Sequence, residues 1–72
     1  MHITVNGREV EIFAGARVAD ALRKFSRAEW TRVRKNEKAV CDRHGHEVGL
    51  DGELREGEAL VVKPRVPEEP RS

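Results

Sequence analysis

Residues 2–13 read HITVNGREVEIF, and this stretch decides the fold. On both sides of Asn6-Gly7, apolar residues alternate with polar ones, which is the period of a half-buried strand. Asn and Gly tolerate the positive φ of a two-residue turn, so this dipeptide between two alternating runs predicts a β-hairpin. A turn here pairs Val5 with Arg8 and fixes which side chains share a face. The residues on the buried face are then Met1, Ile3, Val5, Val10 and Ile12.

The next segment changes from the period of a strand to that of a helix. One helical stripe collects the apolar side chains of Val18, Ala21, Leu22 and Phe25, whereas charged residues take the other side. The pattern predicts an amphipathic helix over about 17–25 that packs on the hairpin. We expect its start to be poorly capped, because no Ser, Thr, Asp or Asn stands there.

A second, short helix is predicted over about 27–35. Ser26 and Glu29 have the spacing of a capping box, in which each side chain bonds the backbone N–H of the other residue. Trp30 and Val33, three positions apart, would face inward.

Two further strand regions follow. Residues 38–42 predict a short strand with Val40 inward, and the turn at 43–45 leads to a second arm that ends at Val48. Near the end of the chain, Leu60-Val61-Val62 forms a nearly continuous apolar run, which suits a central strand.

Beyond Pro64 the composition changes, since proline and glutamate dominate and apolar residues become rare. Such a segment builds neither a sheet ladder nor a core. We therefore expect one domain over residues 1–64 and a flexible Pro/Glu-rich tail over residues 65–72.

The order of elements predicts an α+β fold. The apolar faces are buried most simply when the first and last strands lie side by side at the centre of a mixed sheet of four to five strands, with the main helix across one face. This is the ubiquitin-like β-grasp arrangement.

Five stretches resemble the successive landmarks of the ThiS and MoaD proteins, the small β-grasp sulfur carriers of thiamin and molybdopterin biosynthesis. They are residues 3–7 (ITVNG), 10–12 (VEI), 14–15 (AG), 18–22 (VADAL) and 54–58 (LREGE). The resemblance spans residues 1–64 and implies a β-grasp fold that docks to a larger protein. The same landmarks occur in TGS domains and in plant-type ferredoxins.

The resemblance stops short of the sulfur chemistry. Sulfur carriers use a terminal Gly-Gly whose carboxylate is adenylated, whereas residues 69–72 read EPRS and no glycine follows Gly57. No sulfur-transfer residue is therefore carried over; a sulfur carrier whose tail is processed in an unexpected way is kept as an alternative. The ferredoxin alternative fails because an iron–sulfur cluster needs four cysteines and only Cys41 is present.

Size and composition exclude other classes. A chain of 72 residues and 8.2 kDa builds a single small core, which excludes a multidomain enzyme. One cysteine excludes an internal disulfide and fits a reducing compartment. Because no apolar run approaches the roughly 20 residues of a membrane span and no signal peptide is recognisable, we expect a cytoplasmic location. Neither catalysis nor a cofactor is expected.

The net charge of +1 hides an uneven distribution. Residues 17–43 hold nine basic and four acidic side chains, whereas the remainder holds five basic and nine acidic ones. We expect docking to an acidic surface of a larger protein, such as an adenylating enzyme or an oxidoreductase. The alternative is a TGS-like RNA-binding module that uses the basic segment 32–43 beside Trp30. The candidate partner-binding cations are Arg32, Arg34, Lys35, Lys38 and Arg43.

Two apolar residues complete the candidate binding set. Phe13 and Val61 would point to the outer face of the sheet, opposite the helix, and form a small apolar patch amid charge.

A thiol and two imidazoles gather in residues 41–46, CDRHGH, and these are ligand types that zinc prefers. Cys41, His44 and His46 are therefore the candidate metal ligands. On a hairpin these side chains need not converge, so we expect Cys41 to pack as a small apolar residue and no metal to bind.

Overall fold

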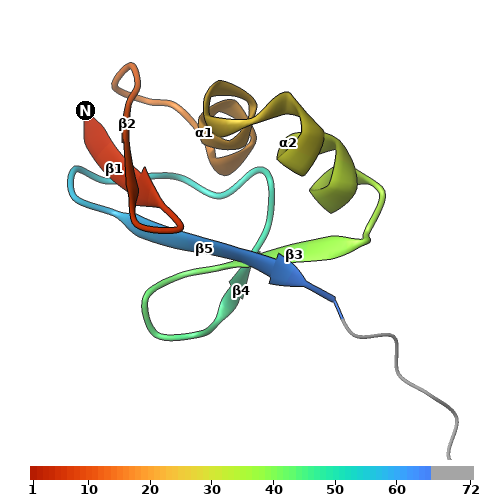
Figure 1. Ribbon diagram of the computed structural model, residues 1–72. Helices are drawn as coiled ribbons and strands as arrows, with labels where there is room; N and C mark the ends of the chain where they lie inside the picture. Colours follow the sequence, from red (N-terminus) through yellow and green to blue (C-terminus); the bar gives the residue numbers. More distant parts are fainter. Residues whose placement is uncertain (66–72) are drawn as a thin grey trace, which may run out of the picture.

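A computed structural model describes residues 1–65 and shows a five-stranded sheet with two helices on one face (Figure 1). The strands are β1 (His2–Val5), β2 (Arg8–Glu11), β3 (Lys38–Cys41), β4 (Glu47–Val48) and β5 (Ala59–Pro64), and the helices are α1 (Val18–Phe25) and α2 (Arg27–Arg34). The strand order is β2-β1-β5-β3-β4, with β1 and β5 parallel and the other pairs antiparallel. The first and last strands are thus adjacent at the centre, and the predicted β-grasp is confirmed.

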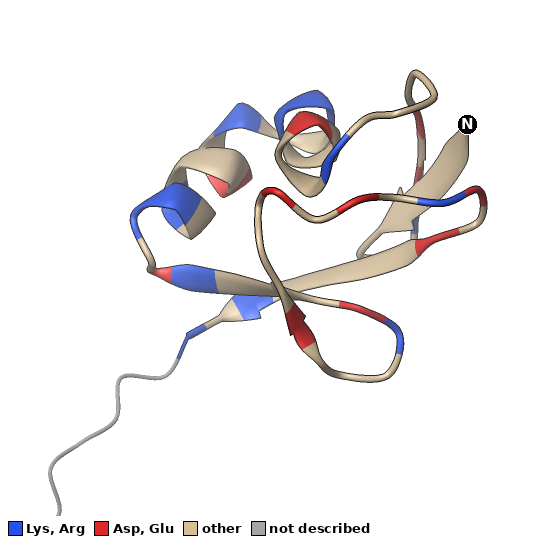
Figure 2. Cartoon of the chain, turned by 180° about the vertical axis from the view of Figure 1, so that it is seen from behind, with Lys and Arg blue, Asp and Glu red and all other residues tan. Residues whose placement is uncertain are grey.

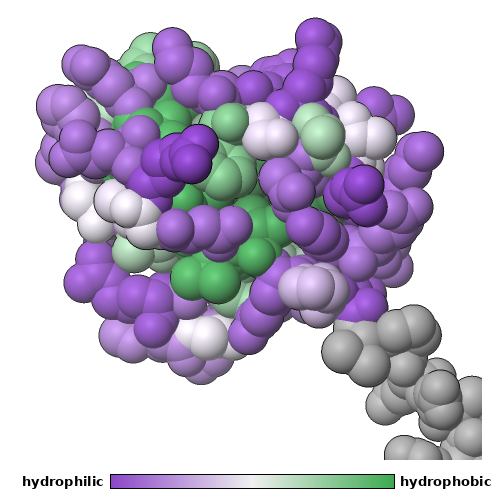
Figure 3. All heavy atoms as spheres, in the orientation of Figure 1, coloured by the Kyte–Doolittle hydropathy of each residue, from purple (hydrophilic) through white to green (hydrophobic). Residues whose placement is uncertain are grey.

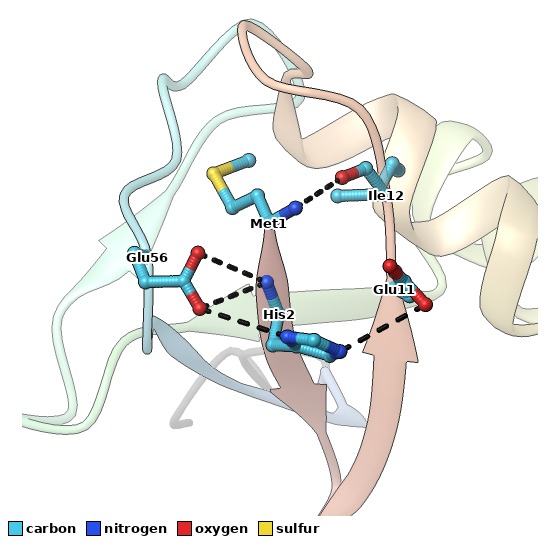
Figure 4. A network of polar contacts seen from close by, with 5 residues as sticks. All are labelled: Met1, His2, Glu11, Ile12 and Glu56. Carbon is cyan, nitrogen blue, oxygen red and sulfur yellow. Dashed lines mark hydrogen bonds and ion pairs between the residues drawn. The ribbon is translucent and has the colours of Figure 1, made fainter.

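The first hairpin has the predicted register. Asn6 and Gly7 take φ angles of 54° and 79°, as a tight two-residue turn requires, and Val5 pairs with Arg8. Past the strand ends, the Ile12 N–H donates to the Met1 carbonyl at 2.8 Å, and the Met1 amino group donates to the Ile12 carbonyl at 2.9 Å; Figure 4 shows the second of these bonds. The alternation of apolar residues therefore fixed the buried face correctly.

The core lies between the sheet and the helices. Its largest fully buried side chains come from β1, α1, β3 and β5: Ile3, Val5, Val18, Leu22, Val40 and Leu60. Burial of one such side chain contributes about 1.5–3 kcal/mol, so this small cluster carries much of the fold's stability. The last member of the helical stripe, Phe25, is only partly buried at the end of α1.

The start of α1 is better satisfied than its sequence indicates. The Asp20 carboxylate accepts a hydrogen bond from the Arg17 backbone N–H at 3.0 Å. The N–H groups of Val18 and Ala19 donate to the carbonyls of Gly52 and Leu50, each at 3.0 Å. The loop after β4 therefore satisfies orphan donors that no local residue could.

The second helix forms as predicted, but only half of its capping box is present. Ser26 Oγ accepts the Glu29 backbone N–H at 3.3 Å, whereas the Glu29 carboxylate turns to Lys38 at the start of β3, 2.8 Å from its Nζ. Trp30 and Val33 pack against the core, as expected. Glu29 thus takes part in the α2 cap through its backbone N–H and, through its carboxylate, in an ion pair with Lys38 that joins the helix to the sheet.

Glu56 and Gly57, in the segment before β5, form hydrogen bonds with His2 at the start of β1. The Glu56 carboxylate accepts the His2 backbone N–H at 3.1 and 3.2 Å, and its oxygen lies 3.8 Å from His2 Nδ1 (Figure 4). Gly57 N–H donates to the His2 carbonyl at 2.8 Å. These contacts hold the loop of residues 51–58, which we call the acidic loop, beside β1.

At the far end of β5, Arg65 still contacts the domain. Its backbone N–H donates to the Glu37 carbonyl at 3.1 Å, and its guanidinium pairs with the Glu47 carboxylate. The expected flexible tail otherwise falls on residues 66–72, outside the described residues. Within residues 1–65, neither helix has the length and apolar character needed to cross a membrane.

Candidate partner-binding surface

The two helices present a concentration of positive charge to solvent. We call their exposed cations the helical basic surface: Arg23, Lys24, Arg27, Arg32, Arg34 and Lys35. Of the two acidic residues of these helices, Asp20 contacts Arg17 and pairs with Arg23 of this surface, whereas Glu29 contacts Lys38 outside it. The side chains left facing solvent are therefore mainly cationic.

Asp20 is held in its ionised form by its surroundings. The Arg17 backbone N–H and then the Arg23 guanidinium donate to the carboxylate, and both lower its pKa below the ordinary 3.8. Asp20 thus stays charged at neutral pH while it caps α1 and orients Arg23.

The single tryptophan lies beneath two of these cations. The guanidinium carbons of Arg23 and Arg34 lie 5.4 and 5.1 Å from the Trp30 ring centroid, within the range of cation–π attraction. The ring also packs against the core, and its buried Nε1 has no hydrogen-bond partner among residues 1–65. Trp30 therefore lies against the core and beneath Arg23 and Arg34, where it supports the basic surface.

The structure places the five basic candidates at three different sites. Arg32 and Arg34 lie in the last turn of α2 and Lys35 is its C-cap; Arg32 approaches Glu37 at 4.0 Å, whereas Arg34 lies over Trp30. Lys38 is paired with Glu29, and both side chains are about a quarter exposed. Arg43 lies past the other end of β3, where its guanidinium donates to the Gly57 carbonyl at 3.1 Å. The segment 32–43 is therefore not one continuous patch.

Sequence spacing alone missed half of the helical basic surface. Arg23, Lys24 and Arg27 join the α2 cations because α1 and α2 pack against each other. The signal was present in the apolar stripe of α1, which leaves residues 23 and 24 on the outer side of the helix.

Acidic side chains gather on β4 and on the loop that leads to β5, which contacts Arg17 at the start of α1. Figure 2 shows red segments along β4 and along the loop that leads to β5, and blue segments on the two helices. Residues 47–58 carry five acidic side chains against one basic one, Arg55. The uneven charge along the sequence is thus an uneven charge in space.

The two apolar candidates are exposed, as expected, but they do not form one patch. Phe13 is 62% exposed and lines a groove that also contains Met1 and residues of α1, whereas Val61 is 41% exposed in the middle of β5. The strand register sets Val61 level with Asn6, and Phe13 beyond the opposite end of β1. Six residues of strand separate these levels by roughly 20 Å.

The candidate metal ligands do not converge. Cys41 is 5% exposed, whereas His44 and His46 lie in the exposed turn with ring centroids 6.3 Å apart. No group of three His, Cys, Asp or Glu side chains in residues 1–65 has an arrangement that could hold a metal ion. Cys41 is thus buried at the end of β3 and apart from the two imidazoles.

The turn after β3 is organised by Asp42. Its carboxylate accepts the backbone N–H groups of His46 and His44, at 3.0 and 2.9 Å. These hydrogen bonds, with the His46 N–H first, lower the Asp42 pKa below its ordinary value. The carboxylate is therefore committed to shaping the turn.

Comparison with known proteins gives a structural match. The sequence has no significant match among protein families or curated proteins. The structure is similar to SAMP1 from Haloferax volcanii, with a TM-score of 0.65 and 18% sequence identity over 94% of this chain and 97% of that one. The two folds therefore agree over nearly their whole length, and this chain has the ubiquitin-like β-grasp fold.

Proposed function

We propose that this chain is a non-catalytic docking protein whose helical basic surface binds an acidic surface of a larger protein. The observation that carries the proposal is the difference in charge between the outer side of the two helices and the segment 47–58, which comprises β4 and most of the loop before β5. Such a distribution orients a small protein during encounter and raises its association rate. The resemblance to ThiS and MoaD proteins supports a protein partner, with an adenylating enzyme or an oxidoreductase as the class.

The absence of catalysis is part of the proposal. Cys41 is the only thiol in the sequence, and it is buried. In residues 1–65, no hydrogen bond joins its sulfur to either imidazole of the neighbouring turn. This arrangement supports a structural thiol, because a nucleophilic one needs an adjacent base and access to substrate.

We also propose that the chain carries no sulfur itself. Residues 58–72 contain no glycine, whereas the sulfur carriers use a Gly-Gly pair. Incubation with ATP and an adenylating enzyme of the ThiS/MoaD type should leave the intact protein mass unchanged. A mass increase of an adenylate or a thiocarboxylate would contradict this part of the proposal and revive the sulfur-carrier alternative.

Docking is tested by affinity capture from native extract with matched charge variants. The variant Arg32→Glu/Lys35→Glu reverses two cations of the helical basic surface. The control Arg55→Glu/Lys63→Glu makes the same change in net charge at exposed residues elsewhere. We expect a protein partner that the wild type and the control recover and that the surface variant loses. Equal recovery by all three would exclude the helical basic surface as the binding site.

The RNA-binding alternative is tested separately. RNA binding would use the Trp30 ring for base stacking, but this ring lies under Arg23 and Arg34. Two of the candidate phosphate-binding cations, Lys38 and Arg43, form hydrogen bonds to Glu29 and to the Gly57 carbonyl. A gel-shift titration against tRNA at two salt concentrations should therefore show no binding. Binding with a steep salt dependence would favour the RNA alternative, since phosphate contacts release counterions.

A further inference from the structure

The strand β2 has an open hydrogen-bonding edge. Met1 and Ile12 exchange both backbone bonds, and bonded pairs alternate along an antiparallel ladder. Arg8 and Val10 therefore bond to β1, whereas Glu9 and Glu11 direct their N–H and C=O groups away from the sheet. In the described part of the chain, no backbone hydrogen bond joins Glu9 or Glu11 to another segment.

A groove runs beside this edge, between β2 and α1. Its wider part holds about 740 Å³ and is lined by Met1, Ile12 and Phe13, with Lys24 on the helix side. A shallower part continues past Val10 to Phe25, and the two parts share Glu11 and Lys24. Figure 3 shows apolar atoms in the middle of the face seen in Figure 1, surrounded by hydrophilic side chains. The open edge thus adjoins apolar side chains.

A second copy of this chain is poorly suited to pair with the open edge of β2. If two β2 strands paired antiparallel with their helices on one side of the joined sheet, residues of the same face would lie opposite each other. The outer-face residues of β2 are Glu9 and Glu11, so glutamates would meet glutamates. Like charges directly opposite are destabilising, and the edge therefore selects a strand of different composition.

We propose that β2 binds an extended segment of a partner protein, which adds to the sheet as an antiparallel sixth strand. Its residues opposite Glu9 and Glu11 carry Lys or Arg, and the residues between them are apolar and face the groove near Phe13 and Phe25. Main-chain hydrogen bonds supply affinity in this mode, and alternate side chains supply specificity. The groove meets the helical basic surface at Lys24, but the open edge of β2 and the α2 cations are tested with different variants, so either proposal can fail without the other.

The probe is a blocked seven-residue peptide in which lysine alternates with valine, titrated into the isotope-labelled protein and followed by amide NMR. A peptide of the same composition, with the lysines in one block and the valines in another, controls for non-specific charge attraction. We expect the alternating peptide to bind about tenfold more tightly, and to slow hydrogen exchange at the amides of Glu9 and Glu11. Equal binding of the two peptides would overturn the proposal.

Methylation of peptide backbone nitrogens tests the hydrogen bonds directly. In the proposed register the lysines oppose Glu9 and Glu11 and exchange bonds with them, so methylation of the lysine nitrogens should abolish binding. Methylation of the valine nitrogens should leave binding intact. Equal effects of both methylations, or shifts confined to the acidic loop 51–58, would overturn the proposed site.

Two variants of the protein complete the test. Glu11→Pro removes an outward N–H and no bond to β1, and should weaken binding of the alternating peptide about tenfold. Glu11→Gln keeps the backbone N–H donor and should lose only the part of the affinity that comes from the ion pair with a peptide lysine and that weakens with salt. If the NMR spectrum shows that Glu11→Pro does not fold, binding of the lysine-methylated peptide to the wild-type protein tests the same hydrogen bonds.

Discussion

The side chain of Asn6 takes the place of a strand residue beside β5: its Oδ1 accepts the backbone N–H of Val62 at 2.8 Å. The Asn6 N–H donates to the Leu60 carbonyl at 2.9 Å, so the parallel ladder continues to this residue. At Asn6 the chain turns with a φ of 54°, and the side-chain amide then supplies the acceptor for Val62. One residue therefore forms the turn and extends the central pairing.

Substitutions at Asn6 separate these two roles. Asn6→Gly keeps the positive φ but leaves the partly buried Val62 N–H without its acceptor, so we expect a loss of about 1 kcal/mol or more in the free energy of unfolding. Asn6→Asp keeps an acceptor and tolerates the same φ, and should stay within about 0.5 kcal/mol of the wild type. Urea denaturation measures both; equal stability of the glycine variant and the wild type would show that the bond is not needed.

Asn6 also shows which structural features can be predicted from the sequence and which cannot. The dipeptide Asn6-Gly7 and the alternation around it predicted the hairpin and its register, because turn geometry and the period of a strand are local properties. The bond to Val62 joins residues 56 positions apart. No local pattern carries that information, since it depends on the parallel pairing of β1 with β5.

Gly52 should resist a side chain. An added Cβ would lie 3.1 Å from the Gly49 carbonyl oxygen and 3.3 Å from Val18 Cγ2, at the point where the loop meets the start of α1. We expect Gly52→Ala to lower the free energy of unfolding by about 1–3 kcal/mol, as overpacking does. In the matched variant Gly49→Ala the nearest atom is 4.0 Å away, so little change is expected. Equal thermal stability of the two variants would refute this reading of the loop.

The loop at Gly52 also explains why the start of α1 was predicted to be poorly capped. Sequence reasoning looks for a cap within a few residues of the helix, whereas here Leu50 and Gly52 bring their carbonyls from more than 30 positions away. The length and apolar stripe of α1 were predictable because periodicity is local. The satisfaction of its first N–H groups depended on the completed fold.

Acid should weaken the domain in part through Asp20. Its pKa is lowered in the folded state, so the ionised carboxylate binds its donors more tightly there than in the unfolded chain. The stabilisation is complete above about pH 5 and is lost as the pH falls through the folded pKa, below 3.8. We expect the stability difference between the wild type and Asp20→Asn to shrink over this range in thermal unfolding. A difference that stays constant down to pH 2 would contradict the assignment.

The contact between Glu29 and Lys38 should stabilise the fold and play no part in docking. The pair is 2.8 Å long and only about a quarter exposed, so a double-mutant cycle with Glu29→Gln and Lys38→Met should give a coupling of roughly 0.5–1 kcal/mol. Lys38→Met should leave capture of the partner unchanged. A coupling near zero, together with a loss of capture, would return Lys38 to the binding surface.

The basic candidates show the same difference between what a local pattern predicts and what depends on the completed fold. Arg32, Arg34 and Lys35 could be placed in solvent from the helical pattern alone, because a helix fixes which side chains share its outer face. Whether Lys38 and Arg43 were free depended on Glu29 and on the Gly57 carbonyl, which the fold brings to them. Phe13 and Val61 were likewise identified as exposed, but their separation follows from the strand register.

The association rate of the purified chain with its captured protein partner, measured by stopped-flow at two ionic strengths, tests the central claim most directly. We expect the wild-type rate to fall steeply with salt, and the Arg32→Glu/Lys35→Glu variant to associate at least about tenfold more slowly at low salt. The Arg55→Glu/Lys63→Glu control should stay close to the wild type. A rate that is insensitive to salt and equal in all three proteins would contradict docking through the helical basic surface.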